Sequence, residues 1–326
     1  MSLAAEEPVG RPVDELARQI IELTFRFRRL ADPDDPCGEQ PCETCYAVHH
    51  DRVRRYLERG QPVHFLLPAF PAKSRNPGKV IGALPDLGER ISVEFLQTFC
   101  ELVSHVHAPG ARILICSDGH VFADLLGIPD DDVTAYRAEL QRIIDTLGTE
   151  SIGLYSLDDA FGLDSYDDMR AVLVERYGIP LEELRQEVRN DLQARAMFNG
   201  MHRFMVEDHV PLTQGTSRSQ VSKACKELAY QMIQRSRAWG DLVGDLFPDS
   251  LRLSIHPQHA HAGKIGFHLI RTRDNWLTPW HGVIVDDGQS VTLMKRSQAE
   301  SANASLVWRH GRPSHYVHIR PEENAS

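Results

Sequence analysis

The chain has 326 residues, of which 42% are hydrophobic and 25% are charged, and its formal net charge is −10. This length and composition are typical of a globular protein with a full core, and they exclude fibrous and low-complexity chains. The acidic balance disfavours nucleic acid as a partner, because phosphate contacts need clustered lysines and arginines, although a local basic pocket for one small phosphate stays open.

The sequence also disfavours membrane insertion and export. No stretch reaches the roughly eighteen consecutive apolar residues that a membrane-spanning helix needs. The first residues are acidic where a signal peptide would be basic and then apolar, so we expect a cytoplasmic protein without membrane contact. We expect residues 1–12 to be disordered and residues 13–326 to form one α/β domain with a helical insertion at about 158–241.

The N-terminal part begins with a predicted helix over 13–30, whose apolar residues follow helical spacing. The segment after it is rich in proline and acids and carries three cysteines and two histidines, Cys37, Cys42, Cys45, His49 and His50. These residues offer enough ligands for zinc, but the spacing C-x4-C-x2-C contains the usual C-x2-C pair only once. We therefore expect a surface loop with free thiols and no metal.

A loop rich in cations and hydrogen-bond donors follows the first predicted strand, 62–68, which a short basic helix over 52–59 precedes. Its polar residues include Lys73, Ser74, Arg75 and Lys79. Such a loop suits an anionic ligand such as a phosphate ester, although it is not a Walker loop. The alternative is a basic loop that is simply solvated.

A second polar turn ends the predicted strand 112–116, which follows a helix over 86–106 and precedes a helix over 121–126. The turn contains Ser117, Asp118, Gly119 and His120. Ligands of open α/β sheets bind beyond the carboxyl ends of the strands, so this turn is a candidate site. The alternative is a turn in which Asp118 caps the following helix and Gly119 supplies a positive φ.

The order of the predicted elements indicates the fold class. A helix over 133–147 and a strand over 151–155 continue a strand-helix-strand pattern that is typical of βαβ units. We predict a Rossmann-like, mostly parallel sheet with helices on both faces and added helical segments. Those segments are predicted over 169–176, 181–188, 192–209 and 221–241.

The last part of the chain adds further strands and candidate ligands. Strands are predicted over 251–257, 264–269 and 280–285, followed by short β pieces over 291–321. Arg252, Ser254 and His256 share one face of their strand, and His281 lies in another. Arg218 and Ser219 stand at a helix start, where an anion can bind, although charges there are more often solvated.

Four segments together resemble the pyoverdine/dityrosine biosynthesis family, the isocyanide (isonitrile) synthases: HFLLPAFPAKS at 64–74, ICSDGHVFADLLGIPDDDV at 115–133, RLSIHP at 252–257 and TPWHGVIV at 278–285. The resemblance covers about residues 15–295. It implies a carbon-carbon lyase of secondary metabolism that needs no cofactor. The enzyme would convert the α-amine of L-tyrosine or L-tryptophan, with tyrosine favoured, to an isonitrile. Ribulose 5-phosphate would donate the carbon, and a downstream oxygenase would be the pathway partner.

Residue chemistry and placement then predict the roles. The candidate acids, bases and amine catalysts are Lys73, Asp118, His120, His256 and His281, with Lys73 acting as a point charge or through a Schiff base. The candidate substrate-binding residues are Ser74, Arg75, Lys79, Ser117, Arg218, Ser219, Arg252 and Ser254. Two other functions stay open: a sugar-phosphate or amino-acid binding protein without turnover, and a metallohydrolase built on the cysteine-rich segment. For His256 and His281, a structural role is the alternative.

Overall fold

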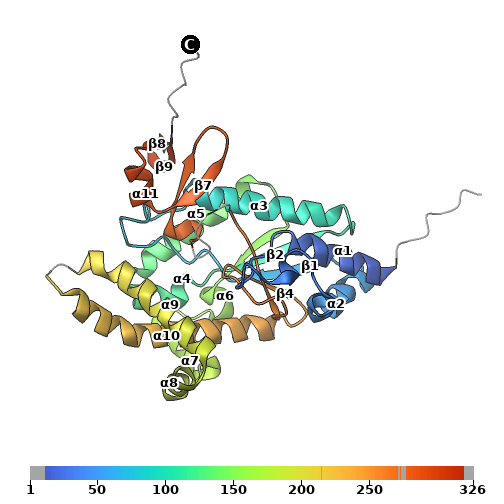
Figure 1. Cartoon of the computed structure of the whole chain (residues 1–326), viewed down its shortest axis with the longest axis horizontal. Coiled ribbons are helices and arrows are strands. Elements are labelled where there is room, and N and C mark those ends of the chain that lie inside the picture. Colours follow the sequence, from blue (N-terminus) through green and yellow to red (C-terminus); the bar gives the residue numbers. More distant parts are fainter. Residues whose placement is uncertain (1–11, 214, 271, 273–276, 319–326) are drawn as a thin grey trace, which may run out of the picture.

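A five-stranded parallel sheet forms the centre of the molecule (Figure 1). It is seen in a computed structural model, which describes residues 12–213, 215–270, 272 and 277–318. The strand order is β3-β2-β1-β4-β5. The strands are β1 (Val63–Leu67), β2 (Ala111–Cys116), β3 (Ile152–Tyr155), β4 (Leu251–Ser254) and β5 (Lys264–Gly266). Parallel pairing throughout this sheet confirms the predicted α/β fold with a mostly parallel sheet.

The helices before β3 are α1 (Val13–Phe25), α2 (Glu43–Glu58), α3 (Leu87–Ser104), α4 (Gly119–Leu126) and α5 (Asp130–Thr146). Helix α1 ends earlier than predicted, because the residues after Phe25 form isolated bridges to Phe267 and Gln258. Helix α2 starts inside the segment that we expected to be a loop, so Cys42 is its N-cap residue. Helix α3 starts where an Asp86 capping box satisfies its first N–H groups.

Between β3 and β4 the chain is helical, as predicted. The helices are α6 (Leu157–Phe161), α7 (Tyr166–Tyr177), α8 (Leu181–Asn190), α9 (Leu192–His209), the 3-10 helix η2 (Val210–Leu212) and α10 (Arg218–Leu246). The bounds of α9 agree with the prediction, whereas α6 was not expected and α10 is longer at both ends. Helices α7, α8 and α9 all contact α10, which ties these helices into one layer.

The sheet is buried on both faces by two separate apolar clusters. Phe65, Leu67 and Ile113 point into a cluster with α1, α2, α3 and α5. Leu66, between Phe65 and Leu67, points to the other face, where it packs with Trp239 of α10. Because successive side chains of a strand alternate between faces, an apolar run such as β1 needs cover on both sides.

A second, four-stranded sheet of order β7-β6-β9-β8 ends the chain and contacts α3 (Figure 1). Its elements are β6 (Val283–Asp286), β7 (Val291–Met294), α11 (Arg296–Ser301), β8 (Ser305–Arg309) and β9 (Arg312–Val317). The predicted strand 280–285 was wrong at its start, since Trp280 and His281 belong to the 3-10 helix η3 (Pro279–His281). Pro279 opens this turn because it lacks the N–H that a strand would use.

Two expectations concern the ends of the chain and the membrane. The predicted disorder of residues 1–12 lies outside the described residues, apart from Pro12. Among the helices that the structure describes, none is both long enough and apolar enough to cross a membrane.

Candidate active site

The carboxyl ends of β1, β2, β3 and β4 lie at one edge of the parallel sheet. From β1 the chain passes to β2 and then β3 on one side, and it returns much later to β4 on the other side of β1. The strand order therefore reverses between β1 and β4. Ligands of open α/β sheets bind in the crevice at such a switch point. The segments at this edge are 68–79, 117–120, 156–158 and 255–258.

The loop after β1 is held in an unusual conformation. Phe70 has a φ of 59°, which costs a residue with a side chain on the order of 1–3 kcal/mol. Three contacts compensate: Phe70 is buried, its ring centroid lies 5.1 Å from that of Trp280, and its carbonyl oxygen accepts a 2.9 Å hydrogen bond from Ser117 Oγ. The hydroxyl of Ser117, a predicted substrate ligand, is thus used to fix this loop.

The turn after β2 needs a glycine for space. A Cβ on Gly119 would lie 2.1 Å from the Pro71 carbonyl oxygen and 2.5 Å from Val133 Cγ1. Gly119 is not among the glycines of positive φ, so the alternative of a left-handed turn at this position is wrong. Asp118 does occupy the N-cap position of α4, but its side chain makes no capping hydrogen bond. Its carboxyl group is therefore not explained by helix capping.

Asp118 is a strongly perturbed acid at this edge of the sheet. Its Oδ1 is buried and has no hydrogen-bond partner among the residues that the structure describes. Burial raises the pKa of the Asp118 carboxyl to about 7. A buried carboxyl group that gains and loses a proton near neutral pH suits general acid-base catalysis.

His120, two residues after Asp118, is held in position by side chains from helices α5, α6 and α7. Its ring stacks on Tyr166 with a centroid distance of 3.8 Å, and its Nε2 lies 3.1 Å from Thr134 Oγ1. Its Nδ1 lies 4.0 Å from Asp158 Oδ2. Burial lowers the pKa of His120, despite the opposing charge of Asp158. The imidazole is therefore mainly neutral at pH 7 and can exchange a proton.

Lys73 is fully buried within a set of oxygen acceptors. Its Nζ lies 2.8 Å from Asp86 Oδ2, 2.8 Å from Glu89 Oε2 and 3.0 Å from the carbonyl oxygen of Pro279. Burial opposes the charge, but the two carboxylates outweigh it and raise the pKa of Lys73. An ammonium has three N–H donors, and all three are used. This geometry disfavours both a Schiff base and direct phosphate binding, and it makes Lys73 a link between three segments.

Lys79 is also paired, with acids that come from helix α9. Its Nζ lies 2.5 Å from Asp208 Oδ1 and 3.2 Å from Glu207, and Asp208 Oδ2 accepts a 2.8 Å hydrogen bond from Ser74 Oγ. Glu207 also pairs with Lys295 at 2.5 Å. The two predicted ligands Ser74 and Lys79 are therefore brought together, but their polar groups are shared with carboxylates in this structure.

The two remaining histidines are kept neutral. Burial holds the pKa of His281 well below its usual range, and the charges of Lys79 and nearby cations add to this effect. Burial, together with Arg29 and Lys264, lowers the pKa of His256 to about 4. His256 nevertheless keeps exposed surface.

Five predicted ligands lie apart from these groups or are used elsewhere. Arg75 is exposed and donates to the carbonyl of Gly127. Arg252 donates a hydrogen bond to the carbonyl oxygen of Gly240 at 2.7 Å. It also lines a groove of about 290 Å³ together with Arg52 and Asp241, and this groove lies at the start of β4 and not at its carboxyl end. Ser254 Oγ accepts from the backbone of His256, which shapes that loop. Arg218 and Ser219 are exposed at the start of α10, and within the described chain no hydrogen bond or ion pair joins them to the other candidates.

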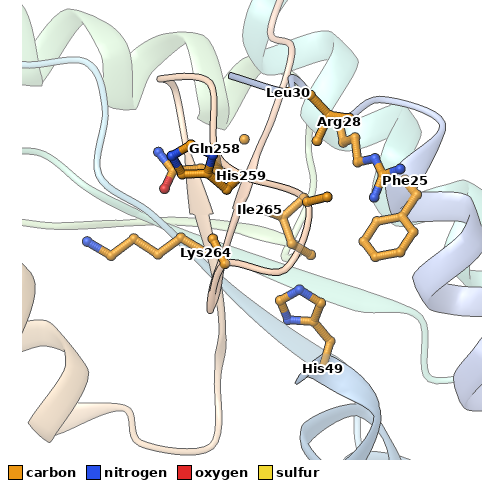
Figure 2. Close-up of a pocket in the computed structure, with 11 residues that line it drawn as sticks. Phe25, Arg28, Leu30, His49, Gln258, His259, Lys264 and Ile265 are labelled. Atoms are coloured by element: carbon orange, nitrogen blue, oxygen red, sulfur yellow. The ribbon is translucent and has the colours of Figure 1, made fainter. Parts of the chain in front are cut away.

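A small cavity elsewhere is too small for either expected substrate (Figure 2). It has a volume of about 10 Å³, enough for about one water molecule. Figure 2 shows Phe25, Arg28 and His49 on its N-terminal side and Ile265 across from them. The cavity lies where residues 25–30 contact residues 258–266.

Sequence reasoning missed the acids that partner the two lysines. The spacing of Asp86 and Glu89 is that of a capping box, so this pair had a local signal that could have been read. Glu207 and Asp208 had none, because they come close to Lys79 only through the packing of α9. The partners of His120 on α5 and α7 were hidden for the same reason.

Comparison with known proteins shows what most of the chain is similar to. A family model described as pyoverdine/dityrosine biosynthesis protein matches residues 53–307. The chain is 46% identical over 302 residues to the L-tryptophan isonitrile synthase AmbI2 of Fischerella ambigua, which covers 93% of this chain and 92% of the relative. It is 42% identical over 305 residues to an L-tyrosine isonitrile synthase of Pseudomonas aeruginosa, covering 92% of this chain and 93% of the relative. The crystal structure of PvcA from Pseudomonas aeruginosa matches with a TM-score of 0.85 and 38% identity, over 93% of this chain and 99% of that one.

Proposed function

The chain belongs to the pyoverdine/dityrosine biosynthesis family, and we propose that it is an isonitrile synthase that acts on the α-amine of an aromatic L-amino acid with ribulose 5-phosphate as carbon donor. The observation that carries the proposal is the Asp118 carboxyl, whose buried Oδ1 lacks a partner in the described chain at the switch point of the sheet. Neutral His120 follows it two residues later, so a proton donor and a proton acceptor stand at one strand end.

The chemistry explains why such a pair is needed. The amine attacks the C2 ketone of the sugar phosphate, and loss of water gives an imine. Further proton transfers allow loss of phosphate and carbon-carbon cleavage. Because an isonitrile carbon is bonded only to nitrogen, both carbon-carbon bonds of C2 have to break. C1 then leaves as formaldehyde and C3 to C5 leave as a three-carbon carbonyl compound, so that the reaction balances without an oxidant or reductant. Each step moves a proton near pH 7, and each well-placed acid or base contributes on the order of 10²-fold or more to the rate.

The residues divide into two groups in this proposal. Asp118 and His120 transfer protons, and His256 and His281 act as further bases or donate hydrogen bonds to the anionic groups of the substrates. Lys73 is a positioning residue, because its three N–H donors are occupied by Asp86, Glu89 and Pro279. For Lys79 to bind phosphate, the anion has to share it with Asp208 or displace that carboxylate.

The choice of amino acid is the finer part of the proposal. The relatives that are 46% and 43% identical act on L-tryptophan by name, and those that are 42% and 34% identical act on L-tyrosine. These identities do not separate the two substrates, so L-tyrosine stays our prediction from the sequence. An oxygenase that consumes the isonitrile is the expected next enzyme.

The test is mass spectrometry of the purified full chain incubated with L-tyrosine or L-tryptophan, with and without ribulose 5-phosphate. We expect an isonitrile from one amino acid only when the sugar phosphate is present. Asp118→Asn and His120→Ala should bind both ligands and form little product. Binding of both ligands without turnover by the wild type would favour a binding protein, the alternative function, and would contradict the proposal.

A further inference from the structure

Four potential metal ligands from distant parts of the sequence meet in one cluster. Cys37 lies in the 3-10 helix η1 (Pro36–Gly38), Cys42 is the N-cap residue of α2, and Cys45 follows in the first turn of that helix. His261 comes from the loop between β4 and β5, more than two hundred positions later in the chain. The three sulfur atoms and one His261 nitrogen all lie within 4.8 Å of one another.

The distances match those of ligands around one zinc ion. With Zn–S near 2.3 Å and Zn–N near 2.0 Å, tetrahedral ligands are about 3.8 Å apart for two sulfurs and about 3.5 Å apart for sulfur and nitrogen. Cys42 Sγ lies 3.8 Å from Cys45 Sγ and 3.2 Å from His261 Nε2. Cys37 Sγ lies 3.9 Å from the same nitrogen. These three distances lie within about 0.4 Å of the tetrahedral values, and every other pair of the four ligand atoms lies within 4.8 Å.

The local backbone favours this arrangement of thiolates. The Asp35 side chain accepts the N–H of Cys37 at 2.9 Å, which fixes the turn that carries the first sulfur. Cys42 and Cys45 stand at the N-terminus of α2, where unpaired N–H groups and the helix dipole stabilise negative charge. Three cysteines and one histidine are a common structural zinc set, and they leave no coordination position for a substrate.

The cluster joins two segments that are already in contact. Backbone hydrogen bonds run from Ala31 N to Gln258 O at 2.9 Å and from Gln258 N to Arg29 O at 3.0 Å. The β4–β5 loop therefore carries both His261 and, nearer to β4, the candidate base His256, and Gln258 between them is bound to the N-terminal segment. Crosslinking it through a metal would hold both parts of this loop against the N-terminal helices.

We propose that Cys37, Cys42, Cys45 and His261 bind one structural zinc ion, which fixes the β4–β5 loop and so positions His256. This site replaces our expectation of free thiols, and it does not depend on the proposed reaction. It differs from the metallohydrolase alternative, since four protein ligands leave no open position for a zinc-bound water.

The experiment starts with elemental analysis of the full wild-type chain, purified under reducing conditions without added metal or chelator. We expect one zinc ion per chain, and we expect cobalt(II) exchanged into the site to give the strong visible absorption of tetrahedral thiolate coordination. His261→Ala and Cys42→Ala should lose the zinc. The matched controls His259→Ala, an exposed histidine of the same loop, and Cys225→Ala, a buried cysteine of α10, should keep it.

A chelator provides a readout that does not depend on whether a variant folds. It should lower the melting temperature of the wild type and of both control variants, because metal binding contributes to folding stability. A reduced wild-type chain that carries no zinc and gives no cobalt spectrum would overturn the proposal. So would a disulfide between Cys42 and Cys45 in the freshly purified protein, since it would remove two of the four ligands.

Discussion

Replacing Asp118 with asparagine should make the protein more stable and less active at the same time. Asparagine keeps the shape of the side chain but carries no charge, so it removes the cost of burying a carboxylate whose Oδ1 has no partner in the described chain. Burial raises the pKa of Asp118 from 3.8 to about 7. Each pKa unit corresponds to about 1.4 kcal/mol, so burying the charged form of Asp118 instead of the neutral form costs at most about 4 kcal/mol in the folded state.

The sign of the pH dependence follows from this direction. The folded state holds the Asp118 proton more tightly than the unfolded chain, so wild-type stability falls as the pH rises from about 4 to about 7. Below this range the Asp118 carboxyl is neutral in both the folded and the unfolded state, so Asp118→Asn should have wild-type stability. Above it, the variant should be more stable by a constant amount of about 1–4 kcal/mol.

Urea denaturation of the wild type and the variant at a series of pH values measures this difference. A useful control is Asp124→Asn, since Asp124 lies on the same helix but accepts hydrogen bonds from Arg235 at 2.5 and 2.9 Å. Burial favours the neutral form of the Asp124 carboxyl, but the hydrogen bonds and charge of Arg235 outweigh burial and lower the pKa of Asp124. The variant Asp124→Asn should therefore lose stability at neutral pH. If Asp118→Asn were no more stable than wild type at any pH, Asp118 would be an ordinary N-cap residue and the reasoning would fail.

Three further predictions follow from the same geometry. Lys73→Met leaves two buried carboxylates unpaired, so urea denaturation should show that the free energy of unfolding falls by about 3–5 kcal/mol. In the wild type, borohydride treatment in the presence of both substrates should leave Lys73 unmodified, because its amine forms no Schiff base. Gly119→Ala should cost about 1–3 kcal/mol or more, because its Cβ would lie 2.1 Å from Pro71 O; an unchanged melting temperature would refute this close approach. Binding of ribulose 5-phosphate near pH 6 should take up protons, because an anion raises the pKa of His256 and His281; equal calorimetric enthalpies in buffers of different ionisation enthalpy would contradict it.

Local patterns in the sequence predicted the sheet and most of its helices well. The runs at 62–68 and 112–116 are apolar and bounded by turn residues, and such runs form buried strands whatever packs on them. The sequence also placed Asp118 and His120 correctly after a strand, because the carboxyl ends of parallel strands share one edge. His256 was expected within the strand 251–257, but β4 ends at Ser254 and His256 follows it. The start of α2 was missed, since proline and acidic residues before Glu43 obscured its first turns.

Partners from distant parts of the chain could not be predicted. Lys79 looked like a free cation because nothing near it in sequence marks Asp208 as its partner. Arg252 looked like a ligand because it alternates with Ser254 and His256, but its guanidinium reaches Gly240 on the face covered by α10. His261 escaped notice as the fourth ligand of the cysteine cluster, whereas His49 and His50 were considered only because they were near in sequence.

The central claim is that this chain transfers C2 of ribulose 5-phosphate to the amine of an aromatic amino acid. The most direct measurement uses ribulose 5-phosphate with carbon-13 at C2 and follows the product of the wild-type chain by carbon NMR and mass spectrometry. We predict that the label appears in the isonitrile carbon, and that Asp118→Asn forms little of this product although it is folded. An isonitrile without the label, or full activity of Asp118→Asn, would contradict the account.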